Sequence, residues 1–87
     1  MLEDVKKYLL RLGWSINQRL YPSNSIFNSS CGKYTIRIVN PENQNILILQ
    51  VEKLRNLNIK IFRVDDSNND ENTFKKSLQK VLDEFDN

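Results

Sequence analysis

Apolar residues recur along the chain at two different spacings, and each spacing predicts a different kind of element. In residues 2–12 and 73–85 the apolar side chains lie three or four positions apart, which places them on one face of a helix. The first segment has acids early and bases later, as the helix dipole favours, and Gly13 follows at a position suited to a left-handed cap. We therefore predict one helix near the start of the sequence and one near its end.

The segments between these helices have the alternating or continuous apolar patterns of β-strands. The expected strands are residues 14–20, a short stub at 26–27, 33–39, 46–51 and 59–64. The polar connections between them are short enough to return the chain antiparallel to the preceding strand. The sequence thus predicts a single α+β domain over residues 1–87, with a two-layer fold in which an antiparallel sheet of four or five strands is flanked by an N-terminal and a C-terminal helix.

An acidic loop precedes the second helix and partly matches a calcium-binding EF-hand loop. Its acidic or amide side chains alternate at Asp66, Asn68 and Asp70. However, Glu71 stands where such a loop needs glycine, and Ser77 where it needs a bidentate acid. We interpret the loop as a connection that supplies the N-cap of the helix, with Asp70 or Asn72 as the capping residue.

The residue types present exclude most catalytic sites. The chain has no histidine and one cysteine, Cys31, so it offers no imidazole base, no Ser-His or Cys-His nucleophile and no zinc site of histidines or thiolates. Its two glycines stand alone, which argues against a glycine-rich phosphate loop. We therefore expect a protein that is not an enzyme, with no cofactor and no metal.

The single cysteine also bears on where the protein works. Cys31 cannot form an internal disulfide, which fits a reducing compartment and favours the cytoplasm. No apolar run approaches the roughly 20 residues of a membrane-spanning helix. The first residues are acidic, unlike a secretory signal, so we expect no membrane partner.

The strands 46–51 and 59–64 have apolar side chains on both faces, whereas each predicted helix has a single apolar stripe. If both helices cover the same face, the other face is half basic and polar and half aliphatic. If one helix covers each face, little apolar sheet surface stays open. A contiguous exposed apolar patch usually marks an association site, so the first arrangement predicts a protein-binding surface.

On this basis we expect a small protein that acts through protein–protein contact, as a homodimer, a regulatory inhibitor or adaptor, or a subunit of an assembly. A second copy of the same chain is the favoured partner. The residues expected at the interface are Ile46, Ile48, Ile59, Ile61 and Phe62.

Nucleic-acid binding is the alternative, and it depends on how the charge is distributed. The net charge is only +2, but residues 1–60 hold nine Lys or Arg against four Asp or Glu. A basic and aromatic sheet face of this kind can hold phosphates and stack bases. The residues expected to form it are Arg19, Tyr21, Lys33 and Arg37.

Overall fold

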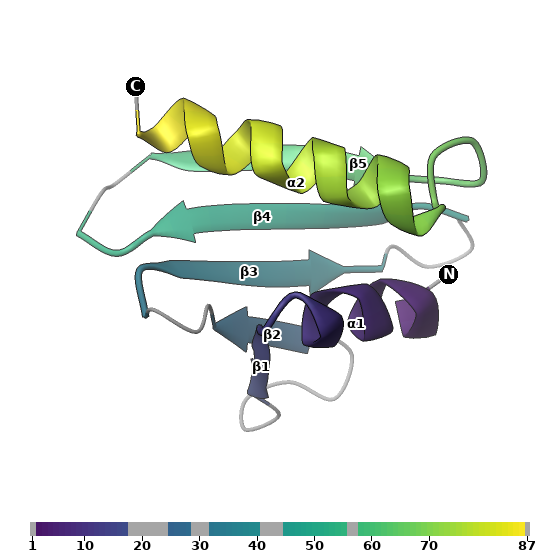
Figure 1. The fold of residues 1–87 in the computed structure, drawn as a ribbon, viewed down its shortest axis with the longest axis horizontal. Coiled ribbons are helices and arrows are strands. Elements are labelled where there is room, and N and C mark those ends of the chain that lie inside the picture. The colour runs from purple at the N-terminus through teal and green to yellow at the C-terminus, as the bar shows by residue number, and fades with distance from the viewer. Residues whose placement is uncertain (1, 18–24, 29–31, 41–44, 56–57, 87) are drawn as a thin grey trace.

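The computed structural model describes residues 2–17, 25–28, 32–40, 45–55 and 58–86 (Figure 1). In chain order the elements are α1 (Leu2–Arg11), β1 (Ser15–Asn17), β2 (Ser25–Asn28), β3 (Tyr34–Val39), β4 (Leu47–Lys53), β5 (Ile59–Val64) and α2 (Glu71–Phe85). The predicted α+β class is confirmed: an N-terminal helix, an antiparallel sheet and a C-terminal helix follow one another along the chain. Part of the predicted strand 14–20 lies outside the described residues, as do Cys31 and most of the loop after β3.

Each strand pairs antiparallel with the next one along the chain, in the order β1-β2-β3-β4-β5. The three longer strands, β3 to β5, form the main part of the sheet, while β1 and β2 have three and four residues. Among the described strands, β5 is an edge of the sheet and pairs with β4 alone. Its position matters because an edge strand presents unpaired backbone groups along its other side.

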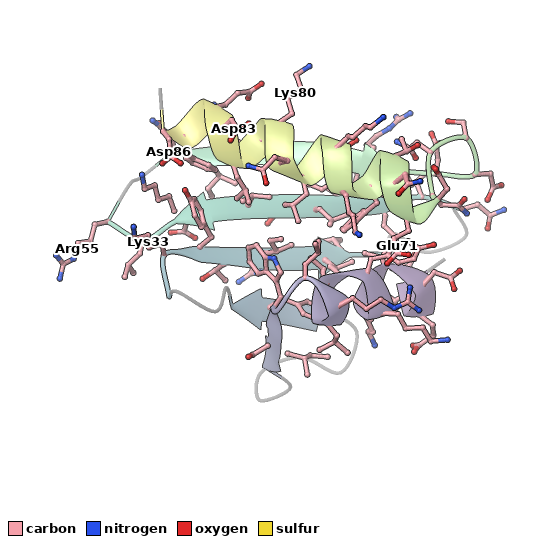
Figure 2. The ribbon with its side chains drawn as sticks, viewed as in Figure 1. Lys33, Arg55, Glu71, Lys80, Asp83 and Asp86 are labelled. Carbon is pink, nitrogen blue, oxygen red and sulfur yellow. The ribbon has the colours of Figure 1, made fainter. Side chains whose placement is uncertain are left out.

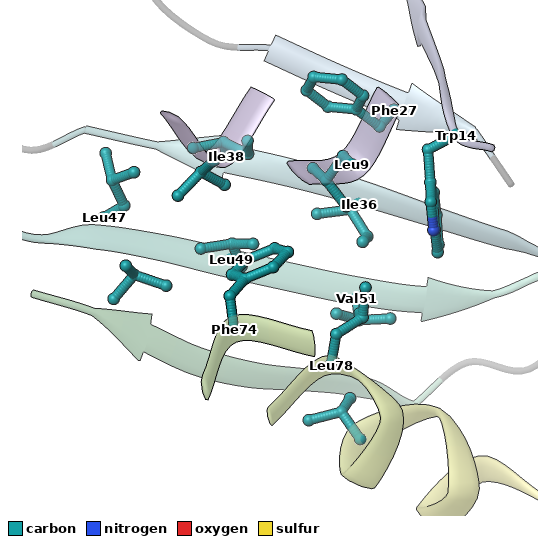
Figure 3. Packing of buried hydrophobic residues seen from close by; sticks show 13 residues of the cluster. Leu9, Trp14, Phe27, Ile36, Ile38, Leu47, Leu49, Val51, Phe74 and Leu78 are labelled. Carbon is teal, nitrogen blue, oxygen red and sulfur yellow. The ribbon is translucent and has the colours of Figure 1, made fainter. Parts of the chain in front are cut away.

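The two helices lie on the same face of the sheet, as Figure 1 shows. Buried side chains alternate along β4, and they pair across the strands with buried side chains of β3, as in Ile36 with Val51 and Ile38 with Leu49. Residues of α1 and α2 join these in one cluster (Figure 3). The core consists of Val5, Leu9, Trp14, Phe27, Ile36, Ile38, Leu47, Leu49, Val51, Val64, Phe74, Leu78 and Val81.

The end of α1 and the start of α2 each have a clear physical basis. Gly13 has a φ of 93°, and this left-handed turn lets the Trp14 amide donate to the Leu9 carbonyl at 3.0 Å, which returns the indole to the core. At α2, the carboxylate of Asp70 accepts from the amide of Thr73 at 3.3 Å and from its hydroxyl at 2.8 Å. The prediction that Asp70 or Asn72 caps this helix is therefore confirmed for Asp70.

Aromatic packing and one ion pair hold α1 against the start of α2. The ring of Phe74 lies 5.6 Å from that of Tyr8 on α1 and 6.0 Å from that of Phe62 on β5, measured between centroids. The guanidinium of Arg11 contacts both carboxylate oxygens of Glu71 at 2.9 and 3.0 Å. Phe74 thus joins both helices to the sheet edge in one contact.

The other end of α2 is attached to the sheet by Asp86, the residue that follows the helix. Its carboxylate accepts a hydrogen bond from Nζ of Lys53 on β4 at 2.8 Å and from the Tyr34 hydroxyl on β3 at 3.2 Å. In Figure 2, Asp86 lies at the same end of the molecule as Lys33. The hydrogen bond from Lys53 and then that from Tyr34 lower the pKa of Asp86 below its ordinary value, and the charge of Lys33 acts in the same direction.

Replacing Phe74 by alanine should lower the free energy of unfolding by about 3–5 kcal/mol, because it empties the contact that joins both helices to the sheet. Urea unfolding followed by circular dichroism measures the change. Leu54→Ala is the matched control, since Leu54 is 66% exposed, and its effect should stay within about 0.5 kcal/mol. Equal effects of the two substitutions would contradict this account of the core.

Replacing Asp86 by asparagine should lower the midpoint of thermal unfolding at neutral pH. Because the pKa of Asp86 is lowered in the folded protein, its carboxylate stabilises the fold above the unfolded pKa and loses that effect as the pH falls through the folded pKa. The difference between the wild type and Asp86→Asn should therefore shrink as the pH is lowered through and below 3.8, the ordinary value. Calorimetry across this range checks it, and a difference independent of pH would count against the assignment.

Candidate functional site: the outer face of the sheet

The face of the sheet opposite the two helices, here called the outer face, is arranged in three rows that cross β3, β4 and β5. The rows follow from the strand register and alternate with the buried rows. They are Val39-Ile48-Arg63, Arg37-Gln50-Ile61 and Thr35-Glu52-Ile59. Among the described residues no helix covers this face.

The apolar part of the outer face is concentrated on the edge strand. Ile59 and Ile61 are 55% and 60% exposed, and they lie two positions apart on β5, so their side chains are neighbours on the same face. Val39 and Ile48 are half-buried and belong to the row beyond Ile61. The result is an aliphatic surface that extends inward from the edge of the sheet.

The polar part of the outer face carries both signs of charge. Arg37 lies opposite Gln50, and Glu52 is the next outer-face residue along the same strand as Gln50. With Thr35 and Ile59 these three line a shallow depression of about 160 Å³. This volume is below the roughly 300–1,000 Å³ of small-molecule sites, so the face is better suited to contact with another surface.

Three of the five residues predicted at the interface are brought together here. Ile48, Ile59 and Ile61 share the outer face, and Ile46 is half-buried just before β4. Phe62 does not join them, because strand alternation places it on the helix side, where its ring packs against Phe74. The prediction that Phe62 belongs to this surface is therefore corrected, and the alternation of β5 was the signal that separates it from Ile61.

The residues of the nucleic-acid alternative are only partly described. Arg37 is exposed on the outer face, and Lys33 is exposed immediately before β3. Arg19 and Tyr21 lie outside the described residues. The outer face also contains Glu52, a diagonal neighbour of Arg37, and a carboxylate at this position opposes binding of a phosphate backbone.

The acidic loop between β5 and α2 uses its polar groups internally. The carboxylate of Asp65 accepts from the Ser67 hydroxyl at 2.5 Å and from the Ser67 amide at 2.9 Å, which lowers the pKa of Asp65. The side-chain oxygen of Asn68 accepts from the Asp65 amide at 2.7 Å. Within the described residues, no group of three metal-ligating side chains is present.

No described helix is long and apolar enough to cross a membrane. Comparison with protein-family models gave no match, and searches of curated proteins and of solved structures found no significant relative.

Because Ile61 is exposed, replacing it by threonine should change the free energy of unfolding by less than about 1 kcal/mol, the range of β-propensity effects. Leu49→Ala, at a fully buried position of the neighbouring strand, should cost about 2–5 kcal/mol. Urea titrations of the two variants test whether the outer face contributes to folding. A loss for Ile61→Thr as large as that for Leu49→Ala would mean that Ile61 is part of the fold rather than a free surface.

Proposed function

We propose that this protein is a non-catalytic protein-binding domain that uses the outer face, and that its partner is a second copy of the chain. The observation that supports the proposal is the pair Ile59 and Ile61, each more than half exposed on an edge strand, on a face that neither helix covers. Exposed apolar side chains that gather in one place are typical of association sites.

The charges on the outer face favour a partner with the same face. A two-fold dimer places the same patch of both copies against each other, so a self-complementary patch needs groups of both signs. The outer face has Arg37 and Arg63 as cations and Glu52 as an anion. A standard interface takes about 800 Å² from each partner, which is about 13% of the 5966 Å² of accessible surface here.

The energy available from the two isoleucines predicts a weak dimer. Burying the exposed half of an isoleucine contributes roughly 1–1.5 kcal/mol, so the four isoleucines of a dimer contribute roughly 4–6 kcal/mol. Association costs an estimated 4–15 kcal/mol in lost freedom of the two molecules. The remaining affinity must come from Val39, Ile48 and the polar groups, and we expect a dissociation constant in the micromolar range.

Sedimentation equilibrium over protein concentrations from about 10 to 500 μM tests this proposal, because a weak dimer dissociates on dilution. Ile61→Asp should abolish the concentration-dependent rise in mass, since it places a charge in the aliphatic part of the proposed interface. Leu54→Asp is the matched control, because Leu54 is 66% exposed against 60% for Ile61 but lies in the turn after β4. Its variant should dimerise like the wild type. A wild type that stays monomeric throughout would refute self-association.

A regulatory inhibitor, an adaptor or an assembly subunit would use the same outer face for a different chain. We place this activity in the cytoplasm, supported by the single cysteine of the sequence. The nucleic-acid alternative stays an untested prediction, and the mixed charge around Arg37 supports protein contact instead.

A further inference from the structure

The helix layer covers its face of the sheet incompletely, because its two helices differ in length. α1 has 10 residues and α2 has 15, which correspond to lengths of about 15 and 22 Å. α1 contacts the first turn of α2, where Arg11 pairs with Glu71 and the ring of Tyr8 packs against that of Phe74. Gly13 then turns the chain away into β1, so the later turns of α2 continue without α1 beside them (Figure 1).

An apolar groove of about 480 Å³ lies at this place, on the opposite side of the molecule from the outer face. Its apolar lining comes from the segment after α1 and from one side of α2, namely Leu12, Trp14, Leu78 and Leu82. Leu12 is 40% exposed, whereas Trp14 is 7% exposed. The volume is within the range of sites that bury a ligand.

The charged residues that line the groove are both cations. Lys75 and Lys76 are exposed, and within the described part of the chain neither one forms an ion pair. On the β5 side of the same helix a second pocket carries both signs of charge, because Lys80 and Arg63 line it together with Glu84. The groove therefore combines an apolar lining with two lysines at one end. Its remaining polar residue, Gln79, donates a hydrogen bond to the carboxylate of Asp83 at 2.8 Å.

The length of the groove corresponds to two turns of a bound helix. Its α2 lining extends from Lys75 to Leu82, a rise of about 10.5 Å, which equals the spacing of anchor residues i and i+7 in a helical ligand. Lys75 and Lys76 are the first two α2 residues of this lining. Carboxylates that pair with them would therefore lie near one end of the bound helix.

We propose that this groove binds an acidic amphipathic helix of another protein, which inserts apolar side chains between Leu12 and Leu82 and places carboxylates beside Lys75 and Lys76. This site goes beyond the proposed self-association and does not depend on it. The two surfaces lie on opposite faces of the sheet, so each is tested by variants that leave the other intact.

Trp14 provides the measurement, because it is the one tryptophan of the sequence and it lines the groove. The probe is a synthetic 15-residue helical peptide with leucines at i, i+4 and i+7 and two glutamates in its first turn. Its titration should change the Trp14 emission in a saturable way. A peptide with lysines in place of the two glutamates should bind at least about tenfold more weakly, and salt should weaken the acidic peptide.

Substitutions in the groove locate the binding site. The double variant Lys75→Glu and Lys76→Glu should weaken the acidic peptide about tenfold and improve binding of the lysine peptide. Leu12→Ser should weaken both, and because Leu12 is partly exposed this variant is expected to fold, which circular dichroism verifies. Lys80→Glu is the control for overall charge, because Lys80 lies one turn after Lys76 but lines the pocket beside β5 and not the groove. This variant should bind the acidic peptide within twofold of the wild type.

Three results would overturn the proposal. The first is an unchanged Trp14 emission at peptide concentrations up to about 1 mM. The second is an equal loss of affinity for the acidic peptide in Lys80→Glu and in the double variant, which would indicate attraction to overall charge. The third is saturation by dodecanoate without any response to the peptides, which would assign the groove to an anionic amphiphile. Ile61→Asp should leave peptide binding unchanged. The proposal of self-association and the proposal of peptide binding can therefore fail independently of each other.

Discussion

The constraint on which the rest of this structure depends is that β4 and β5 have apolar side chains on both faces of the sheet, whereas the two helices pack on one face. Leu47, Leu49 and Val51 of β4 are buried under the helices, and Ile48 of the same strand points the other way. Burial of apolar surface drives folding, so the helices stabilise one face and leave the other to solvent or to a partner. The exposed isoleucines of β5 are the result of this one-sided packing.

Contacts at both ends of α2 fix its position on one face of the sheet. Phe74 packs between Tyr8 and Phe62 near the start of the helix, and Asp86 accepts hydrogen bonds from Lys53 and Tyr34 after its end. A helix attached at both ends has little freedom to shift across the sheet. The part of its surface that α1 does not reach is therefore a fixed feature of the fold.

Local patterns in the sequence predicted the elements well, because helix stripes, strand alternation and caps such as Gly13 and Asp70 depend on neighbouring residues. They did not determine which face of the sheet the helices cover. An apolar stripe shows that one side of a helix is buried, but it does not show which surface that side packs against. The role of Asp86 was also missed: its partners Tyr34 and Lys53 are 52 and 33 residues away in the chain. The groove has the same origin, because it arises where elements of unequal length meet in space.

The positions of the two candidate surfaces have a consequence for assembly. A dimer formed through the outer faces would stack two sheets with their helix layers turned outward, as in a sandwich of two sheets. The groove beside Leu12 and Leu82 would then stay accessible on both copies, because it is on the helix side of each sheet. Such a dimer would present two equivalent grooves, and two grooves bind a ligand with two acidic helices more tightly than one, provided its linker spans both copies.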